Sequence, residues 1–268
     1  MPEKQVAYVE YPASAELSQY VECFWSRTSQ PDDLSDVAPD AHLVLPDGCI
    51  DIVFNFSDGA HRVWNVAEEP PPRSSVVGTM TRPLQVQTGG RVRFIGVRFK
   101  PGKSHHFVGV PAGEITNLTP ALDDIWPADT RGIEDTLSDL TRPDQQVAVL
   151  ERELRRQARR LDSAESCIER LVAFIQTRRG DISVESLSAL AGLTRQQIAR
   201  QFNRYVGLSP KLFCRVVRFQ NILAMARRQQ APDWISIALE SGYYDQAHMI
   251  QDFKEFTGVN PTLFYSHH

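Results

Sequence analysis

The chain has 268 residues, a length that suggests two domains, and 42% of them are apolar, which is enough for substantial cores. No run approaches 18 apolar residues and the first residues lack a basic-then-apolar pattern, so we expect neither a membrane span nor a signal peptide. The net charge of −4 argues against a nucleic-acid binder, but residues 164–268 hold 12 Lys and Arg against 9 Asp and Glu, which leaves 17 against 24 for the rest.

Strand and turn signals dominate the first hundred residues, after one helical pattern at Ala15–Trp25. A strand-turn-strand signal follows, with Pro46–Gly48 as the turn and Ile50–Phe56 as a strand whose apolar residues alternate with polar ones. Many short strands separated by turns predict a small barrel or sandwich. The remaining expected strands are Arg62–Val66, Val76–Gly78, Leu84–Gln87 and Arg91–Phe99.

Helical signals take over after Pro101-Gly102. We expect short helices at His105–Val108 and Leu118–Trp126, and longer ones at Arg131–Leu140 and Asp144–Leu161. The last helix carries a narrow apolar stripe that suits either a coiled-coil-like seam between two copies or packing on its own barrel. The stripe residues are Val147, Leu150, Leu154, Ala158 and Leu161.

The last third of the chain contains two copies of one sequence pattern, with a constant offset of 51 residues. A repeat of this length indicates a duplicated supersecondary unit. Each copy reads as a short helix, a tight turn, and a second helix with one apolar face, which is a helix-turn-helix pattern. The matching pairs are Val184/Ile235, Leu187/Ala238, Ile198/Met249, Phe202/Phe253, Tyr205/Phe256, Gly207/Gly258, Pro210/Pro261 and Phe213/Phe264.

The outward face of each second helix decides between a solvated surface and a DNA-reading one. In the first copy this face is Gln196, Arg200, Asn203 and Arg204, with Gln197 on its flank, and no acidic residue lies between Thr194 and Tyr205. Gln, Arg and Asn pair with base edges. The second copy offers Ala247, Gln251, Lys254 and Glu255, flanked by His248 and Ile250, with Asp245 and Asp252 nearby, so it is electrostatically weaker.

Residues 183–210 (SVESLSALAGLTRQQIARQFNRYVGLSP) and 234–264 (WISIALESGYYDQAHMIQDFKEFTGVNPTLF) resemble the DNA-binding domain of AraC/XylS-type transcription regulators, over roughly 164–268. The resemblance implies seven helices, two helix-turn-helix units and a long central helix, Pro210–Gln229. It places base-reading positions at Gln196, Gln197 and Arg200, and at Gln246, Ala247 and Gln251. Position 251 is commonly Arg in that family. The full set of DNA-contact candidates is Thr194, Arg195, Gln196, Gln197, Arg200, Arg204, Asp245, Gln246, Ala247, His248, Gln251 and Lys254.

The first part resembles N-terminal domains found ahead of AraC-type DNA-binding domains, over about residues 1–130. The likeness rests on LPDGCIDIVFN at 45–55, GTMTRP at 78–83, GVRFKPG at 96–102 and GVPA at 109–112. It implies a cupin-like β-barrel with a regulatory role. The predicted architecture is therefore α+β in two domains: residues 1–162 as a sensor barrel with possible dimerisation helices at 131–161, and residues 163–268 as the DNA-binding domain.

Enzymatic alternatives find little support in the sequence. His42, His61, His105 and His106 lack the spacing of cupin metal ligands, so we expect neither a metal nor another cofactor. Cys49 lies in a turn without a positioned histidine, and no phosphate-binding glycine loop is present. The four scattered cysteines, Cys23, Cys49, Cys167 and Cys214, favour reduced thiols in a cytoplasmic protein.

Taken together, these patterns predict a non-enzymatic, sequence-specific transcription regulator. Its expected partners are double-stranded DNA, a small-molecule effector, RNA polymerase and a second copy of itself. Activation and repression are both open, with an activator as the working expectation. The alternative is a small-molecule-binding or reactive-cysteine barrel fused to a DNA-targeting domain, which would need an exposed thiol of lowered pKa.

Overall fold

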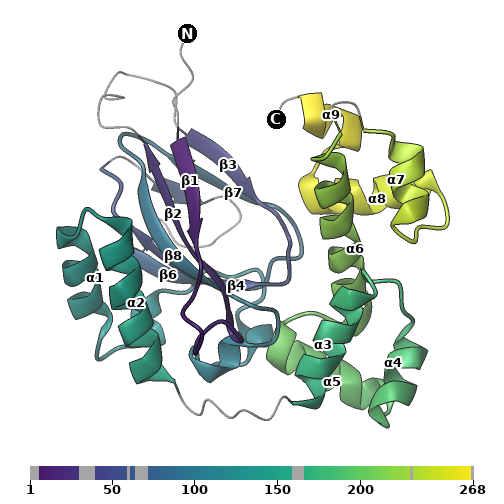
Figure 1. The fold of residues 1–268 in the computed structure, drawn as a ribbon, viewed down its shortest axis with the longest axis horizontal. Coiled ribbons are helices and arrows are strands. Elements are labelled where there is room, and N and C mark those ends of the chain that lie inside the picture. Colours follow the sequence, from purple (N-terminus) through teal and green to yellow (C-terminus); the bar gives the residue numbers. More distant parts are fainter. Residues whose placement is uncertain are drawn as a thin grey trace.

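The computed structural model describes residues 6–29, 40–58, 61–63, 72–158, 166–229 and 232–266. A strand-rich N-terminal part and a helical C-terminal part lie side by side (Figure 1). The predicted boundary between residues 162 and 163 falls outside the described residues. Within the described ranges, no helix combines the length and apolar character needed to cross a membrane.

Two antiparallel sheets form the N-terminal part, as the strand signals predict. The predicted cupin-like closure of these sheets into a barrel stays a prediction. The larger sheet has the order β1-β2-β8-β4-β6, with β1 Val6–Tyr11, β2 Val21–Ser29, β8 Arg93–Phe99, β4 Ile50–Asn55 and β6 Ser74–Val77. The smaller sheet has the order β3-β7-β5, with β3 Asp40–Val44, β7 Leu84–Thr88 and β5 His61–Val63.

The turn at Pro46–Gly48 does not close a hairpin. Strand β3 pairs with β7, whereas β4 pairs with β6 and β8, so the turn carries the chain from one sheet to the other. The predicted apolar face of β4 and the residue after it is buried, with Ile50, Ile52, Phe54 and Phe56 no more than 9% exposed. Alternation thus identified the face of β4 that meets the core.

The helix predicted at Ala15–Trp25 is wrong. Residues 15–20 form turns, with Val21 N–H donating to the Leu17 carbonyl, and β2 begins at Val21. From there the chain pairs with β1 on one side and β8 on the other. Because β2 is an interior strand covered on both faces, its apolar residues do not show the alternation of a half-buried strand.

Short 3-10 helices and two α-helices complete this part: η1 Ser104–His106, η2 Ala112–Glu114, η3 Leu122–Asp124, α1 Thr130–Asp139 and α2 Pro143–Gln157. The helix expected at Leu118–Trp126 is therefore only the single turn η3. In α2 the stripe residues Leu150 and Leu154 are buried in the N-terminal core together with Ile133 and Leu137 of α1. Of the two alternatives for the apolar stripe of α2, the structure shows packing on the sheet of the same chain. Leu161 lies outside the described residues. Dimerisation through these helices stays a prediction.

Seven helices occupy residues 166–229 and 232–266, the number that the resemblance implies: α3 Cys167–Thr177, α4 Val184–Ala191, α5 Arg195–Val206, α6 Pro210–Ala226, α7 Trp234–Glu240, α8 Gln246–Thr257 and α9 Pro261–Ser266. Helices α3–α5 lie at one end of α6 and α7–α9 at the other (Figure 1). One apolar cluster runs through both groups, and Phe213 and Phe219 of α6 are fully buried in it.

Candidate nucleic-acid interface

The first helix pair consists of α4 and α5, and capping interactions fix both ends of α5. Thr194 starts α5 with a capping box, because its hydroxyl accepts from Gln197 N–H at 3.2 Å while Gln197 Oε1 accepts from Thr194 N–H at 2.9 Å. Gly207 ends the helix at φ 80°, a conformation that glycine adopts without strain. The capping box and the C-cap predicted from the sequence are both confirmed.

The second pair, α7 and α8, repeats this arrangement with acidic caps. Asp233 Oδ1 accepts from the N–H groups of Ile235 and Ser236 at the start of α7. Asp245 Oδ1 accepts from His248 N–H at 2.7 Å at the start of α8, and Gly258 ends α8 at φ 83°. The two units therefore share their turn chemistry as well as their spacing.

The predicted inward faces of the second helices are confirmed. In α5, Ile198 and Phe202 are fully buried, and in α8 so are Met249, Phe253 and Phe256. Tyr205 is only partly buried, and its ring packs edge-on against the ring of His105 in the N-terminal part, with ring centroids 4.8 Å apart.

Nearly every predicted DNA-contact residue is exposed: Thr194, Arg195, Gln196, Gln197, Arg200 and Arg204 in the first unit, and Asp245, Ala247, His248, Gln251 and Lys254 in the second, with Gln246 partly buried. Several already have intramolecular roles. Arg195 pairs with Glu185 at 2.9 Å, Gln197 completes the capping box, and Arg204 lies over the ring of Tyr205. Exposure makes these contacts possible, and the base-reading assignments stay predictions.

Helix α6 sets the separation of the two units. It has 17 residues, three fewer than the sequence indicated, so it is about 26 Å long at 1.5 Å per residue. One turn of B-DNA is about 34 Å. Helices α5 and α8 lie toward opposite ends of α6 (Figure 1), an arrangement that contact with two successive major-groove segments requires.

Asp252 does not belong to the outward face of α8, although its position in the sequence suggested a negative charge near the DNA. Its carboxylate is 1% exposed and accepts from Arg215 of α6 at 2.7 Å and from the Tyr243 hydroxyl at 3.0 Å. Arg218 lies over the Tyr243 ring. This network fixes the second unit on α6, and no local sequence pattern predicted it because the partners are 9 to 37 residues apart.

The carboxyl end of α5 is docked on the N-terminal part through two threonines. The Thr79 hydroxyl donates to the Val206 carbonyl and the Thr116 hydroxyl to the Gly207 carbonyl, each at 2.8 Å. Carbonyls at a helix end have no partner within the helix, so these hydroxyls complete the first unit from outside. A Cβ on Gly207 would lie 2.8 Å from the Thr116 Oγ1 and 3.1 Å from the Ala112 carbonyl, so glycine also permits the docking.

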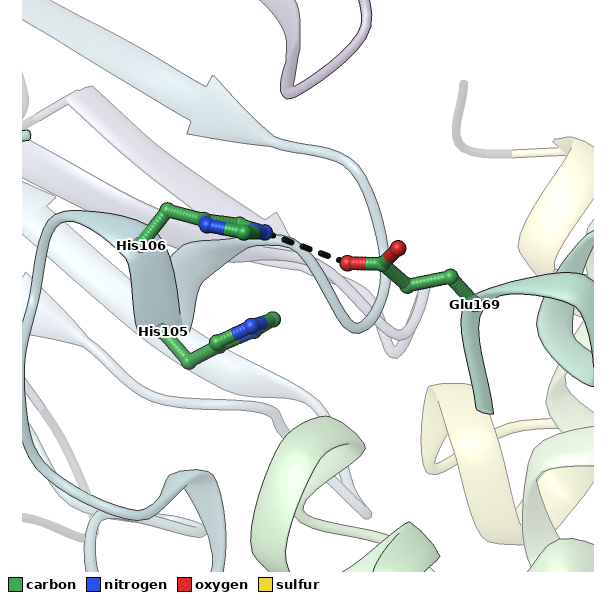
Figure 2. Close-up of side chains that lie close together, drawn as sticks. All are labelled: His105, His106 and Glu169. Atoms are coloured by element: carbon green, nitrogen blue, oxygen red, sulfur yellow. Dashed lines mark hydrogen bonds and ion pairs between the residues drawn. The ribbon is translucent and has the colours of Figure 1, made fainter. Parts of the chain in front are cut away.

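A charged cluster forms a second contact between the two parts (Figure 2). His106 Nε2 lies 3.1 Å from Glu169 Oε1, the contact drawn in Figure 2. Lys103 Nζ lies 3.1 Å from Glu169 Oε2. Burial alone would raise the pKa of Glu169, but hydrogen bonds from His106, from Ser166 N–H and from Lys103 outweigh it and lower the pKa to about 2. Burial lowers the pKa of the neighbouring His105 to about 4.

A cavity of about 520 Å³ lies between the strands and α6. Aromatic and charged residues of the sheets line it, among them Tyr8, Trp25 and Arg98, and α6 contributes Gln220, Leu223 and Arg227. Trp25 Nε1 is buried without a hydrogen bond of standard geometry, but its indole N–H lies close enough to the Asp51 carboxyl to favour the ionised form of that carboxyl.

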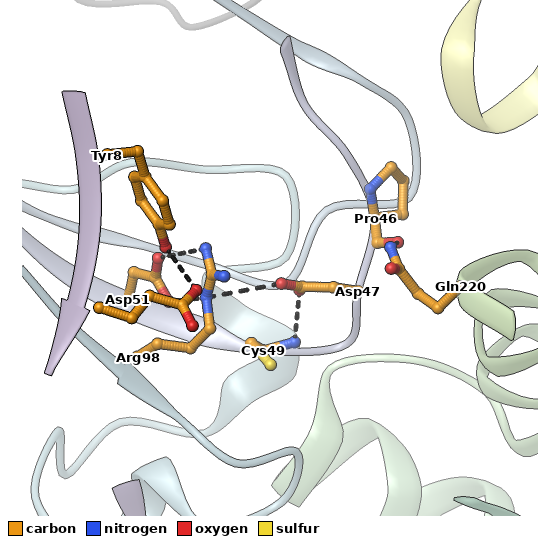
Figure 3. A network of polar contacts seen from close by, with 8 residues as sticks. Tyr8, Pro46, Asp47, Cys49, Asp51, Arg98 and Gln220 are labelled. Carbon is orange, nitrogen blue, oxygen red and sulfur yellow. Dashed lines mark hydrogen bonds and ion pairs between the residues drawn. The ribbon is translucent and has the colours of Figure 1, made fainter. Parts of the chain in front are cut away.

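A polar network connects the cavity to α6 (Figure 3). Arg98 donates to both carboxylate oxygens of Asp51, at 3.1 and 3.0 Å, and lies 3.6 Å from Asp47. The Asp51 carboxylate raises the pKa of Arg98, and burial raises the pKa of Asp51 to about 6. One residue before Asp47, the Pro46 carbonyl accepts from Gln220 Nε2 at 2.6 Å, and a Cβ on Gly48 would lie 2.7 Å from the Phe213 ring.

The thiols do not have the properties of a reactive cysteine. Burial raises the pKa of Cys23 to about 12 and that of Cys214 to about 11, and it raises the pKa of Cys49 as well. Protonated thiols are poor nucleophiles at neutral pH. The structure therefore offers no support for the reactive-cysteine alternative at these three positions.

The C-terminal part has two capped helix-turn-helix units on one connecting helix, and it is attached to a strand-rich domain. These features define a class of protein with paired helix-turn-helix units. Comparison with protein families agrees: residues 187–266 match a helix-turn-helix domain and residues 9–120 match a domain of unknown function (DUF6597). The C-terminal domain is thus similar to AraC-type helix-turn-helix domains and the N-terminal domain to the family of unknown function, each over less than half of the chain.

Among curated proteins, the chain is 33% identical over 94 residues to an uncharacterized HTH-type transcriptional regulator of Haemophilus influenzae, a match that covers 35% of this chain and 31% of the relative. The chain thus matches about a third of that relative's length. Similar solved structures include fatty-acid-bound ToxT of Vibrio cholerae, with a TM-score of 0.48 and 10% identity over 98% of this chain and 96% of that one. A probable AraC family transcriptional regulator from Rhodopseudomonas palustris has a TM-score of 0.34 and 23% identity over 38% of this chain and 95% of that one.

Proposed function

We propose that the protein is a sequence-specific, DNA-binding transcription regulator. The observation that carries this proposal is the pair of capped second helices, α5 and α8, which expose polar faces at the two ends of α6. Helix-turn-helix proteins place such a helix in the major groove, with its amino-terminal residues on base edges. Two such helices joined by α6 can contact two adjacent segments of the major groove.

Each unit contributes different side chains to this reading. In the first, Gln196 and Arg200 are exposed, and Arg200 is suited to guanine. Gln197 uses its carbonyl oxygen in the capping box, which leaves its amide N–H groups to donate. In the second unit Gln251 replaces the arginine that the family commonly has there, so Lys254 is its main cation. We assign the larger share of specificity to α5.

The N-terminal domain, which we take to be cupin-like, acts in this proposal as a sensor of a small molecule. The cavity supports this role because residues of both domains line it. An occupant would touch Arg98 on one side and α6 on the other. It can shift the protein between two states only by its difference in affinity for them, and a near-complete switch needs about 10⁴-fold.

The other expected partners follow from this function. RNA polymerase and a second copy of the chain are proposed as partners, with the activator role as the working assumption. DNA as a target implies the compartment that holds the chromosome, so we propose a cytoplasmic location. No catalytic residue is assigned.

Selection from a genomic fragment pool by the full chain, at two salt concentrations, tests the DNA-binding proposal. We expect enrichment of one sequence and an affinity that falls steeply with salt. Arg200→Ala should cost about 1–3 kcal/mol at a single base pair if Arg200 reads guanine. Arg131→Ala, which removes an exposed cation from α1 of the N-terminal domain, serves as the control. Failure of the wild-type chain to enrich any sequence would overturn the proposal.

A further inference from the structure

Three side chains with metal-binding chemistry converge at the seam between the two domains (Figure 2). His105 and His106 come from η1 of the N-terminal domain and Glu169 from the first turn of α3 in the DNA-binding domain. One ligand atom from each lies within 4.8 Å of the other two. Neither domain holds this set by itself, which is why the histidines alone did not suggest a site in the sequence.

The separations are close to those of a coordinated ion. A tetrahedral ion with bonds of about 2.0–2.1 Å holds its ligand atoms about 3.3 Å apart. His106 Nε2 and Glu169 Oε1 are already 3.1 Å apart, which is one edge of such a tetrahedron. The ligand nitrogen of His105 lies within 4.8 Å of both atoms, so it has at most about 1.5 Å to approach, and small rotations about its side-chain bonds can supply this movement.

His105 is oriented as a metal ligand usually is. Its Nδ1 lies 2.9 Å from the Gly102 carbonyl, and because a carbonyl only accepts, Nδ1 carries the proton. The lone pair of the neutral ring is therefore on Nε2. Metal-bound histidines typically donate their other ring N–H to a backbone carbonyl in this manner, which fixes the tautomer and the ring orientation.

The charge of the cluster also has to accommodate a cation. Lys103 Nζ occupies the Oε2 side of the Glu169 carboxylate, at 3.1 Å, and Ser166 N–H donates to the same oxygen. An ion would take Oε1, where it replaces the contact from His106, whose ring proton moves to Nδ1 or to solvent. Lys103 lowers the affinity by repulsion but leaves the coordinating oxygen accessible.

We propose that His105, His106 and Glu169 form an interdomain site for a divalent transition ion of the zinc class. Two imidazoles and one carboxylate are a common ligand set for Zn²⁺, with a water in the fourth position. Because the ligands come from both domains, the bound ion clamps α3, and with it the first helix-turn-helix unit, to the N-terminal domain. The site is separate from the cavity and from the exposed faces of α5 and α8, so it adds a metal-dependent control to the proposed function.

Titration of the full chain with Co²⁺ in metal-free buffer tests the site, because four-coordinate Co²⁺ has intense visible ligand-field bands. We expect saturation at one equivalent and displacement by Zn²⁺. His105→Ala and Glu169→Gln should each weaken Co²⁺ binding by at least about tenfold. The chain ends in a second adjacent histidine pair, so His267→Ala combined with His268→Ala is the matched control and should leave the affinity unchanged.

His105→Ala decides between this proposal and a simple ion-pair contact, because it leaves the His106–Glu169–Lys103 contacts in place. As a second measurement, Zn²⁺ should raise the melting temperature of the wild-type chain and not that of His105→Ala, whose melting without metal shows whether it folds. The proposal is overturned if the wild-type chain binds no stoichiometric Co²⁺, if His105→Ala binds it equally well, or if removal of the terminal histidines abolishes binding.

Discussion

The two helix-turn-helix units have the same internal construction but are attached to the rest of the protein in different ways. Both second helices start at a side-chain cap and end at a glycine with positive φ, and both bury their inward residues, except that Tyr205 of α5 is only partly buried. The first unit is docked on the N-terminal domain through Thr79 and Thr116, and α3, which precedes it, is docked there through Glu169. The second is held on α6 through Asp252 and its partners.

Their outward faces differ as well. Helix α5 exposes Arg200 and Arg204 without an acidic neighbour, whereas α8 exposes Gln251 beside Glu255. Packing restrains the inward residues of both copies, because any change of volume in a close-packed core is destabilising. The outward residues are free of that restraint. The two units therefore share a common scaffold, and under the proposed function the first unit carries the stronger DNA contact and the attachment to the sensor domain.

The largest expected effect tests the common scaffold. Phe202→Ala and Phe253→Ala each remove a fully buried ring at equivalent positions of the repeat, so each should lower the free energy of unfolding by about 3–5 kcal/mol. Urea unfolding followed by circular dichroism measures both. Leu190→Ala, at a side chain that is 60% exposed, should change it by less than about 0.5 kcal/mol. Full stability of either phenylalanine variant would contradict the equivalence of the two cores.

A pH dependence should distinguish the attachment of the first unit. The pKa of Glu169 is about 2 in the folded protein against 4.5 ordinarily, so the unfolded chain binds more protons between these values. The stabilisation is complete above about pH 4.5 and is lost as the pH falls toward 2. At 1.36 kcal/mol per pKa unit it amounts to about 3 kcal/mol at most.

Unfolding midpoints of the wild-type chain and of Glu169→Gln, in the presence of a chelator, measure this contribution. The difference between them should shrink as the pH is lowered from about 6 to about 3. Glu240→Gln removes an exposed carboxyl from α7 of the second unit and should keep a constant difference from wild type. Parallel curves for Glu169→Gln and wild type would contradict the assignment.

Local patterns were sufficient to predict the C-terminal domain. The caps at Thr194 and Asp245 and the stops at Gly207 and Gly258 depend on residues three to five positions apart, so the sequence contains the whole interaction. The helix predicted at Ala15–Trp25 failed for the opposite reason. Its later apolar residues belong to β2, an interior strand that pairs with β8 at Arg93–Phe99. This partner strand lies some 70 residues further along the chain.

The attachment of the two domains could not be predicted from such patterns. Thr79 contacts a residue 127 positions away and Thr116 one that is 91 away, and nothing in GTMTRP distinguishes a threonine that caps a distant helix from one in a turn. The expectation that Asp252 places a negative charge near the DNA failed for the same reason. The sequence does not distinguish an aspartate in a buried ion pair from an exposed one. Long-range polar contacts require the fold before they can be assigned.

Thr79→Val should have a smaller effect, confined to the docking of the first unit. The substitution keeps the shape of a fully buried side chain but leaves the Val206 carbonyl without its donor, which costs about 1–2 kcal/mol. Thermal unfolding of the full chain measures the loss. Thr136→Val is the matched control, because the hydroxyl of Thr136 donates to the Gly132 carbonyl on an exposed face, where water can replace it. An equal loss in both variants would show that the interdomain bond contributes nothing specific.

The smallest effect sharpens the difference between the two DNA-facing surfaces. Gln251→Arg gives α8 the cation that α5 has at Arg200, and since position 251 is exposed, it should leave stability within about 0.5 kcal/mol of wild type. If residue 251 faces DNA, the variant should gain about 1 kcal/mol in affinity, and the slope of log K against log salt should steepen by about 1. Arg200→Gln is the reciprocal change and should make the slope shallower by a similar amount. Fluorescence anisotropy with the selected DNA, over a series of salt concentrations, measures both slopes. A Gln251→Arg slope equal to that of wild type, alongside a shallower Arg200→Gln slope, would mean that only the first unit meets the DNA and that α8 serves another partner.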